Sequence, residues 1–179
     1  MFKSFATLAL ATLALIIMQT LSGFAQHTPK LADDEIASVA VVANQNDIDF
    51  AKIAQIKSKD AKILEFAQTM ASDHQSVIDQ AVALVTKLKV TPKDNAVSKS
   101  MVADAKKTEK ILNGKSGKAF DKAYIDNEVS YHKAVISAVE NVLIPQAQNG
   151  ELKALLQAVV PTLKTHLEHA EMVQSHFSK

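Results

Sequence analysis

The chain has 179 residues, with 20 lysines, no arginine, 19 acidic residues and no cysteine. This length suits a single domain. The absence of cysteine excludes disulfides, iron–sulfur clusters and thiol nucleophiles. A formal charge of +1 and only 5% aromatic residues, none of them tryptophan, argue against a nucleic-acid partner. With only four glycines and four prolines, the sequence lacks the turn residues of a β-sandwich or barrel, so we predict an all-α protein.

The first 25 residues are typical of a secretory signal peptide. Lys3 is the only basic residue, an uncharged apolar stretch follows at 8–18, and the segment closes on Gly-Phe-Ala. We expect cleavage after Ala25, which leaves a flexible segment at 26–32. The mature protein is then exported to the bacterial periplasm, either free or associated with the outer membrane.

Removal of this segment leaves 19 lysines and 19 acidic residues, so the mature chain is neutral. A neutral chain has no excess positive charge to attract DNA or anionic lipid, so we expect no nucleic-acid partner. We also expect no integral membrane span in the mature chain. The alternative is a retained membrane anchor, because the 22 residues at 4–25 carry no charge. Polar residues within that stretch favour cleavage.

From residue 33 onward, apolar residues recur alternately three and four positions apart, which is the spacing of one helix face. This pattern predicts four long helices and one weaker amphipathic helix, at about 33–56, 60–90, 97–112, 117–148 and 150–177. We expect Asp33 to cap the first helix, Pro145 to kink or end the third long helix one turn early, and Pro161 to kink the last helix. Short corners predict antiparallel neighbours, while the weaker helix lies in an irregular crossover between the second and third long helices.

Five ionisable residues interrupt the apolar stripes, and we call them the polar layer: Asp47, His74, Glu128, His132 and His166. Counted from the corners, they lie at similar heights. His132 precedes the corner residue Asn149 by 17 residues and His166 follows it by 17, while Asp47 and His74 differ by roughly 4.5 Å. Isolated buried charges are costly, so these groups must pair with one another or share a cation.

Two interpretations of the polar layer stay open from the residues alone. In the first, a hydrogen-bonded network fixes the register of the helices and does no chemistry. In the second, the layer binds a metal, because imidazole and carboxylate are the usual ligands of Zn, Fe, Ni and Cu. The three imidazoles would then be ligands, Glu128 a fourth ligand or an orienting group, and Asp47 an acceptor behind them. We expect Asp73, His169 and His176 to be solvated; the alternative for Asp73, next to His74 in the chain, is to orient a ligand histidine.

Three motifs follow one another along the chain: Phe66-Ala67 with Met70 and Asp73-His74, Phe120-Asp121 with Tyr124 and His132, and His166-Leu167 with Ala170. In this arrangement the chain resembles the bacterial family catalogued as domain of unknown function 4142, although Asp47 stands where members often carry glutamate. The resemblance implies an exported, ferritin-like four-helix bundle, here at 33–178, and no established activity.

The Glu-x-x-His motifs of di-iron bundles are missing from the predicted helices. We therefore expect any site to hold a single transition metal ion, Zn, Cu, Ni or Fe. No nucleophile or phosphate-binding motif is present either, so the sequence predicts a binding protein of the envelope or of a stress response rather than an enzyme. The alternative is a structural or protein-interaction module whose polar layer only fixes helix register.

Overall fold

The computed structural model describes residues 30–177, which form helices and no strands. In chain order these are α1 (Asp33–Lys57), α2 (Ala61–Leu88), α3 (Ala96–Asn113), α4 (Gly117–Ala138), the π-helical turn η1 (Val139–Leu143), α5 (Ile144–Gln146), α6 (Gly150–Gln174) and the 3₁₀ turn η2 (Ser175–Phe177). The predicted all-α class is confirmed. The first three helices begin and end within two residues of their predicted bounds.

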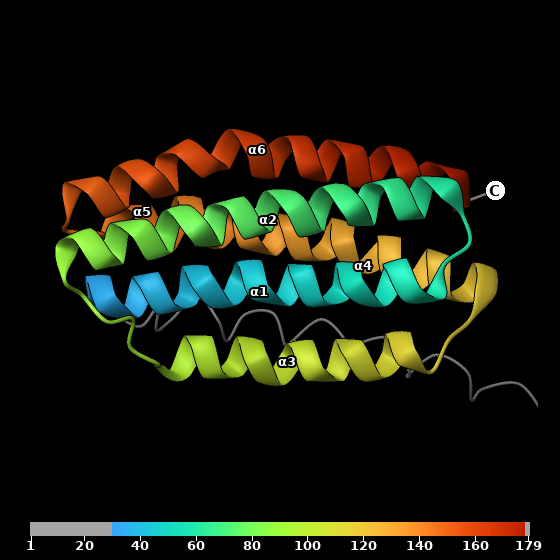
Figure 1. Cartoon of the computed structure of the whole chain (residues 1–179), viewed down its shortest axis with the longest axis horizontal. Helices are drawn as coiled ribbons and strands as arrows, with labels where there is room; N and C mark the ends of the chain where they lie inside the picture. The colour runs from blue at the N-terminus through green and yellow to red at the C-terminus, as the bar shows by residue number, and fades with distance from the viewer. Residues whose placement is uncertain (1–29, 178–179) are drawn as a thin grey trace, which may run out of the picture. The chain divides into compact units, whose positions relative to one another are not determined.

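α1, α2, α4 and α6 form a four-helix bundle in which each helix runs antiparallel to its neighbours (Figure 1). α1 packs chiefly on α2 and α4 on α6, and the two pairs meet through α2 with α6 and α1 with α4. The short corners at 58–60 and 147–149 turn the chain back on itself within each pair. The predicted ferritin-like four-helix bundle is therefore confirmed.

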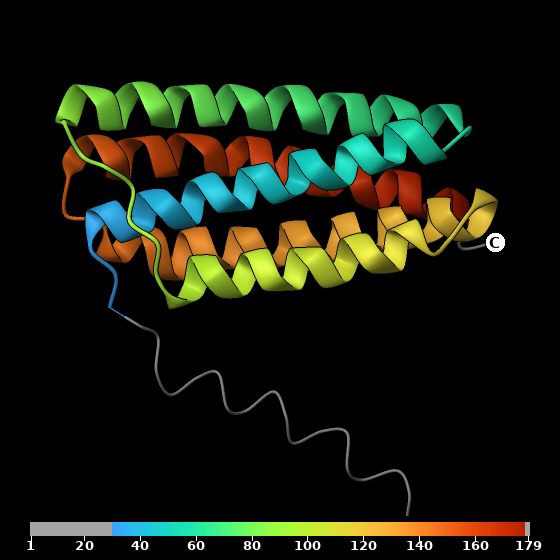
Figure 2. The same cartoon turned by 60° about the horizontal axis from the view of Figure 1, so that its bottom comes forward.

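α3 is the crossover that this arrangement requires. α2 finishes at one end of the bundle and α4 starts at the other, so the chain must travel back along the bundle between them (Figure 1). The 18 residues of α3 span about 27 Å at the helical rise and cover most of that distance. α3 lies outside the bundle against α1 and α4 (Figure 2), and only one of its faces is buried.

Polar side chains secure the starts of several helices. Asp60, Asn95 and Asn149 each accept hydrogen bonds from two backbone N–H groups in the first turn of α2, α3 and α6, at 2.9 to 3.3 Å. Asp33, predicted as the cap of α1, is instead its first residue. The Asp33 carboxylate accepts from the backbone N–H groups of Gln148 (2.8 Å) and Asn149 (2.9 Å), which joins the start of α1 to the corner before α6.

The predicted third long helix, 117–148, is not one continuous α-helix. α4 gives way to the five-residue π-helical turn η1 and then to α5, which ends at Gln146. Pro145 accounts for the change, because it has no N–H to donate and its ring crowds the carbonyl of the preceding turn. Pro161 lies inside α6, which continues as one helix and bends near its middle, in agreement with the predicted kink (Figure 1).

Two apolar clusters fill the bundle, and the polar layer separates them along the helices. The first contains large side chains from α1, α2 and α4, among them Phe50, Phe66, Phe120 and Tyr124. The second lies toward the other end and contains, among others, Ile36, Leu143, Leu156 and Leu163. None of the five residues of the polar layer belongs to either cluster.

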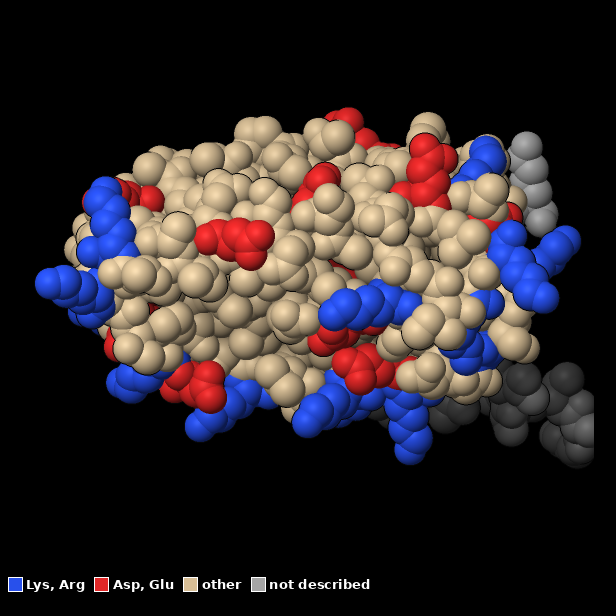
Figure 3. All heavy atoms as spheres, in the orientation of Figure 1, with Lys and Arg blue, Asp and Glu red and all other residues tan. Residues whose placement is uncertain are grey.

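The predicted signal peptide at 1–25 lies outside the described residues. Leu31, from the segment predicted to be flexible, is buried in the second apolar cluster, and its N–H donates to Oε1 of Gln146 at 2.6 Å. Among the helices within 30–177, none is both long and apolar enough to cross a bilayer. On the face shown in Figure 3, lysine and acidic side chains are interspersed.

We expect Asp33→Ala to lower the free energy of unfolding by about 1–2 kcal/mol, because it leaves two backbone donors at the corner before α6 without their acceptor. Urea denaturation measures the change. Asp79→Ala is the control, since Asp79 is exposed and, within residues 30–177, accepts a hydrogen bond only from the side chain of Gln75. Its effect should stay within about 0.5 kcal/mol. Equal effects of the two substitutions would contradict the role given to Asp33.

Candidate metal centre

Each of the four bundle helices contributes to the polar layer. Asp47 lies on α1, His74 on α2, Glu128 and His132 on α4, and His166 on α6. All five residues are at most 4% exposed, so the layer is enclosed by the bundle. The structure brings together all five side chains that the sequence singled out.

One ring nitrogen of His74 is hydrogen-bonded and the other is not. Nδ1 lies 2.7 Å from Oδ1 of Asn44 on α1. The amide nitrogen of Asn44 donates to the carbonyl of Ala40 at 2.8 Å, so the atom that faces His74 is the acceptor oxygen. We infer that Nδ1 carries the proton and that Nε2, which has no hydrogen-bond partner, presents a bare lone pair.

In His132 and His166, too, one ring nitrogen is hydrogen-bonded and the other is not, but the acceptors differ. Nδ1 of His132 lies 3.0 Å from the main-chain carbonyl of Glu128, one turn earlier on α4. Nε2 of His166 lies 2.9 Å from Oδ2 of Asp73 on α2. Carbonyl and carboxylate oxygens accept, so these two nitrogens are the donors. The opposite nitrogens, Nε2 of His132 and Nδ1 of His166, have no hydrogen-bond partner and are bare.

The three imidazoles face one another across the middle of the bundle. A ring nitrogen from each of His74, His132 and His166 lies within 4.8 Å of the others, and the ring centroids are 5.2 to 5.7 Å apart. A histidine that donates one N–H to an outer acceptor and turns its other nitrogen inward has the geometry of a metal ligand. Bare lone pairs gathered in this way repel one another unless a proton or a cation lies between them.

Asp47 lies at the spacing expected of a fourth ligand. Its Oδ2 is 3.4 Å from Nε2 of His74 and 3.7 Å from Nε2 of His132. Ligand atoms bound at about 2.1 Å to a tetrahedral ion are about 3.4 Å from each other. Asp47 therefore faces the bare nitrogens, whereas the sequence suggested an acceptor behind the ligands.

The Glu128 side chain lies beside the other ring nitrogen of His132. Its Oε2 is 3.7 Å from Nδ1, the nitrogen that carries the proton. The main-chain carbonyl of Glu128 is the group that orients the ring, at 3.0 Å. Asp47 thus lies where the sequence suggested Glu128 as a fourth ligand, while Glu128 orients His132 through its main-chain carbonyl. An orienting group was the other role suggested for Glu128.

Burial favours the uncharged form of four residues of the polar layer, Asp47, His74, Glu128 and His132. Loss of water raises the pKa of Asp47 to about 8. Burial, and to a smaller extent the carboxylate of Asp47, raise the pKa of Glu128. The nearby amide of Asn127 acts in the opposite direction, although its nitrogen forms no hydrogen bond with Glu128. Burial and the neighbouring imidazoles lower the pKa of His74 to about 3, and burial lowers the pKa of His132 to about 4.

A closed hydrogen-bond network does not satisfy the polar layer. The buried atoms without a hydrogen-bond partner include both carboxylate oxygens of Asp47 and of Glu128, Nε2 of His74 and of His132, and Nδ1 of His166. Native proteins leave few such groups. Their concentration in one layer is the observation that a function must explain.

Two residues outside the polar layer orient the imidazoles, and only one of them was considered from the sequence. Asn44 lies outside the apolar stripe of α1, and nothing in the sequence separates it from a surface asparagine. Asp73 was expected to be solvated, and its side chain is 43% exposed, yet it accepts the N–H of His166. Its position next to His74 in the chain was the available signal, but the pairing with α6 is a contact between helices.

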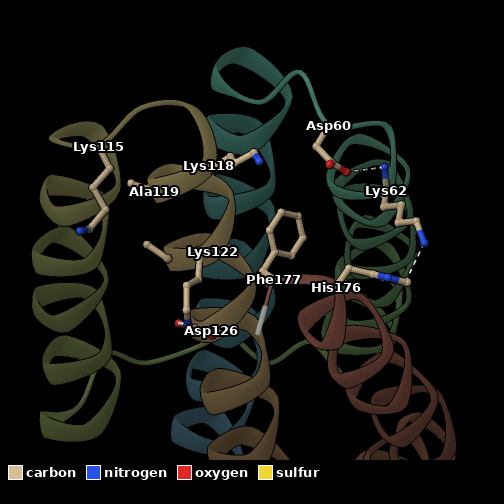
Figure 4. Close-up of a pocket in the computed structure, with 10 residues that line it drawn as sticks. Asp60, Lys62, Lys115, Lys118, Ala119, Lys122, Asp126, His176 and Phe177 are labelled. Carbon is tan, nitrogen blue, oxygen red and sulfur yellow. Dashed lines mark hydrogen bonds and ion pairs between the residues drawn. The ribbon is translucent and has the colours of Figure 1, made fainter. Parts of the chain in front are cut away.

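The remaining sites singled out lie away from the layer. The ring of His169 packs on Phe66 with centroids 5.1 Å apart, and His176 contacts Nζ of Lys62 at 2.6 Å. Figure 4 shows an open hollow at one end of the bundle, where lysines gather around Phe177. The lysines of this hollow are exposed, so the polar layer is the stronger candidate for a functional site.

A family model described as Domain of unknown function (DUF4142) matches residues 19–173. The chain belongs to this family. The resemblance drawn from the three sequence motifs is therefore confirmed, and each motif supplies one of the three histidines that face one another in the DUF4142 bundle described above.

A solved structure described as CopM in the Cu(II)-bound form has a similar fold, with a TM-score of 0.61 and 14% sequence identity. The match covers 83% of this chain and 99% of that chain. At this identity the match shows the fold alone. No curated protein matches the sequence.

In the metal-free protein we expect the free energy of unfolding to fall as the pH rises from about 6.5 to about 8. Asp47 keeps its proton in the folded state up to a pKa of about 8, whereas the unfolded chain loses it near 3.8. Between these values Asp47 holds one more proton in the folded state, so this residue alone lowers the stability by about 1.4 kcal/mol per pH unit. Below 6.5 the unfolded chain protonates His74 and His132 while the folded rings stay neutral, which opposes this slope.

Denaturation of chelator-treated protein across this pH range measures the slope. The amide of Asp47→Asn does not ionise, so this variant should show a slope smaller by about 1.4 kcal/mol per pH unit. Glu128, whose pKa is also raised by burial, should account for the slope that remains. Asp79→Asn on the surface of α2 should leave the slope unchanged. A slope that is the same in Asp47→Asn and the wild type would show that Asp47 is ionised in the folded, metal-free protein.

Proposed function

We propose that this protein is an exported metal-binding bundle of the bacterial envelope. The observation that carries the proposal is the set of bare nitrogens on His74, His132 and His166, with Oδ2 of Asp47 at ligand spacing from two of them. A transition metal ion at their centre would use lone pairs that otherwise repel. It would also link all four helices of the bundle, since each helix supplies one ligand.

Three imidazoles and one carboxylate suit Zn, Cu, Ni or Fe, and geometry alone does not select among them. The structural neighbour is described as Cu(II)-bound, which makes copper the first metal to test beside zinc. The proposed role is to hold or buffer the ion in the envelope, as in a response to metal stress. This role needs no substrate cleft at the layer, and it agrees with the burial of every ligand.

We expect chelator-stripped, tag-free protein to bind one equivalent of Zn(II) or Cu(II) tightly in calorimetric titration. His132→Ala should weaken binding by at least about 100-fold, because it removes a ligand and leaves the other imidazoles without their partner. Asp73→Asn should weaken binding by about 10- to 100-fold, because the amide no longer orients His166 as the carboxylate does. A free metal concentration of 100 times Kd should stabilise the fold by about 2.7 kcal/mol.

His176→Ala is the matched control, since this histidine is exposed and contacts only Lys62 among the described side chains. It should bind metal as the wild type does. A wild-type protein that binds none of Zn, Cu, Ni or Fe below about millimolar would refute the metal site. The polar layer would then be a device that fixes helix register, in a structural or interaction module.

We expect the mature chain to begin at Gln26, because the preceding Gly-Phe-Ala suits a signal peptidase. Mass spectrometry of protein recovered from the periplasm of an expressing bacterium gives the N-terminus directly. A chain that retains Met1 and stays with the membrane fraction would contradict cleavage and support the anchor.

A further inference from the structure

Two buried polar groups beside the proposed site take no part in it. Both carboxylate oxygens of Glu128 and the hydroxyl of Tyr124 lack hydrogen-bond partners, although each residue is 0% exposed. The Tyr124 ring lies between those of Phe66 and Phe120, with centroids 6.2 Å away in both cases, so packing holds it in place. Buried groups in a native protein are seldom left without partners, and these two call for a ligand.

The Tyr124 hydroxyl and the Glu128 carboxylate lie on the same side of the polar layer, near the carboxylate of Asp47. Tyr124 and Glu128 lie four residues apart on α4 and share one face of that helix. An oxygen of Glu128 lies within 4.8 Å of an oxygen of Asp47 and of a ring nitrogen of His132. Burial and then the charges of Glu128 and Asp47 raise the pKa of the Tyr124 phenol, which is therefore within electrostatic reach of both carboxylates.

One ion at the imidazole position would leave these two groups without a partner. Asp47 faces the bare nitrogens of His74 and His132, and an oxygen of Asp47 also lies within 4.8 Å of an oxygen of Glu128. A second divalent ion on the side of Glu128 and Tyr124 would give the buried oxygens of both residues a partner.

We propose that Asp47 bridges two cations, and that Glu128 and Tyr124 complete a second position for an oxygen-preferring divalent cation. A set of oxygen ligands suits hard ions such as Mn(II). Two ions that share such a bridge lie about 3.5–4 Å apart. The inference rests on the proposed function, since Asp47 belongs to both positions, and it goes beyond the single ion that the sequence suggested.

The test uses the full mature chain loaded with one equivalent of Zn(II), which fills the imidazole position. Mn(II) is then titrated, and the free ion is followed through its six-line electron paramagnetic resonance spectrum. We expect about one equivalent of Mn(II) to bind while the zinc stays in place, as checked by elemental analysis. Glu128→Gln and Tyr124→Phe, which preserve shape, should each weaken Mn(II) binding by about tenfold or more without loss of zinc. Asp79→Asn is the surface control and should bind as the wild type does.

The outcomes separate this inference from the function on which it rests. A wild-type chain that binds no zinc in the first step refutes the metal centre as a whole. A chain that holds one zinc but takes up no Mn(II) leaves the metal centre standing and overturns the second position. Mn(II) binding that is unchanged in both Glu128→Gln and Tyr124→Phe also overturns it, because the ion would then lie elsewhere.

Discussion

A neutral imidazole has two ring nitrogens but one proton, and the arrangement of this bundle depends on where three such protons point. In His74, His132 and His166 the N–H donates outward, to a side chain of α1, to the main chain of α4 and to a side chain of α2. The bare nitrogens are thereby turned inward. Since the rings come from three helices and Asp47 from the fourth, only one register of the bundle assembles the set.

This constraint also explains why the core has two parts. Apolar clusters on either side of the polar layer supply the burial that holds the helices together, while the layer itself lacks hydrogen-bond partners for most of its inner atoms. Burial raises the pKa of Asp47 and of Glu128 and lowers the pKa of His74 and of His132, which favours the uncharged form of each of these four groups. Packing therefore holds these side chains in place without an ion, and preorganisation of this kind would lower the entropic cost of binding at the proposed site.

The polar layer has a nitrogen side and an oxygen side, and Asp47 lies between them. The imidazoles of α2, α4 and α6 suit borderline transition metals, whereas Glu128 and Tyr124 offer only oxygen. Membership of the DUF4142 family and the fold shared with CopM establish the architecture, and neither describes this division. The division follows from which atoms of this chain are buried without partners.

The amino-acid sequence by itself determined the helices, their corners and the height of the five ionisable residues in the bundle, because helical periodicity ties spacing to face and the helical rise ties residue count to height. It did not anticipate the π-helical turn before Pro145, since a helix can avoid the clash of a proline ring with the preceding turn in more than one way. Only the tertiary structure decided which nitrogen of each histidine is bare, and that Asp47 rather than Glu128 faces the lone pairs. These choices depend on Asn44 and Asp73, acceptors that other helices bring to the rings and that no spacing within one helix can reveal.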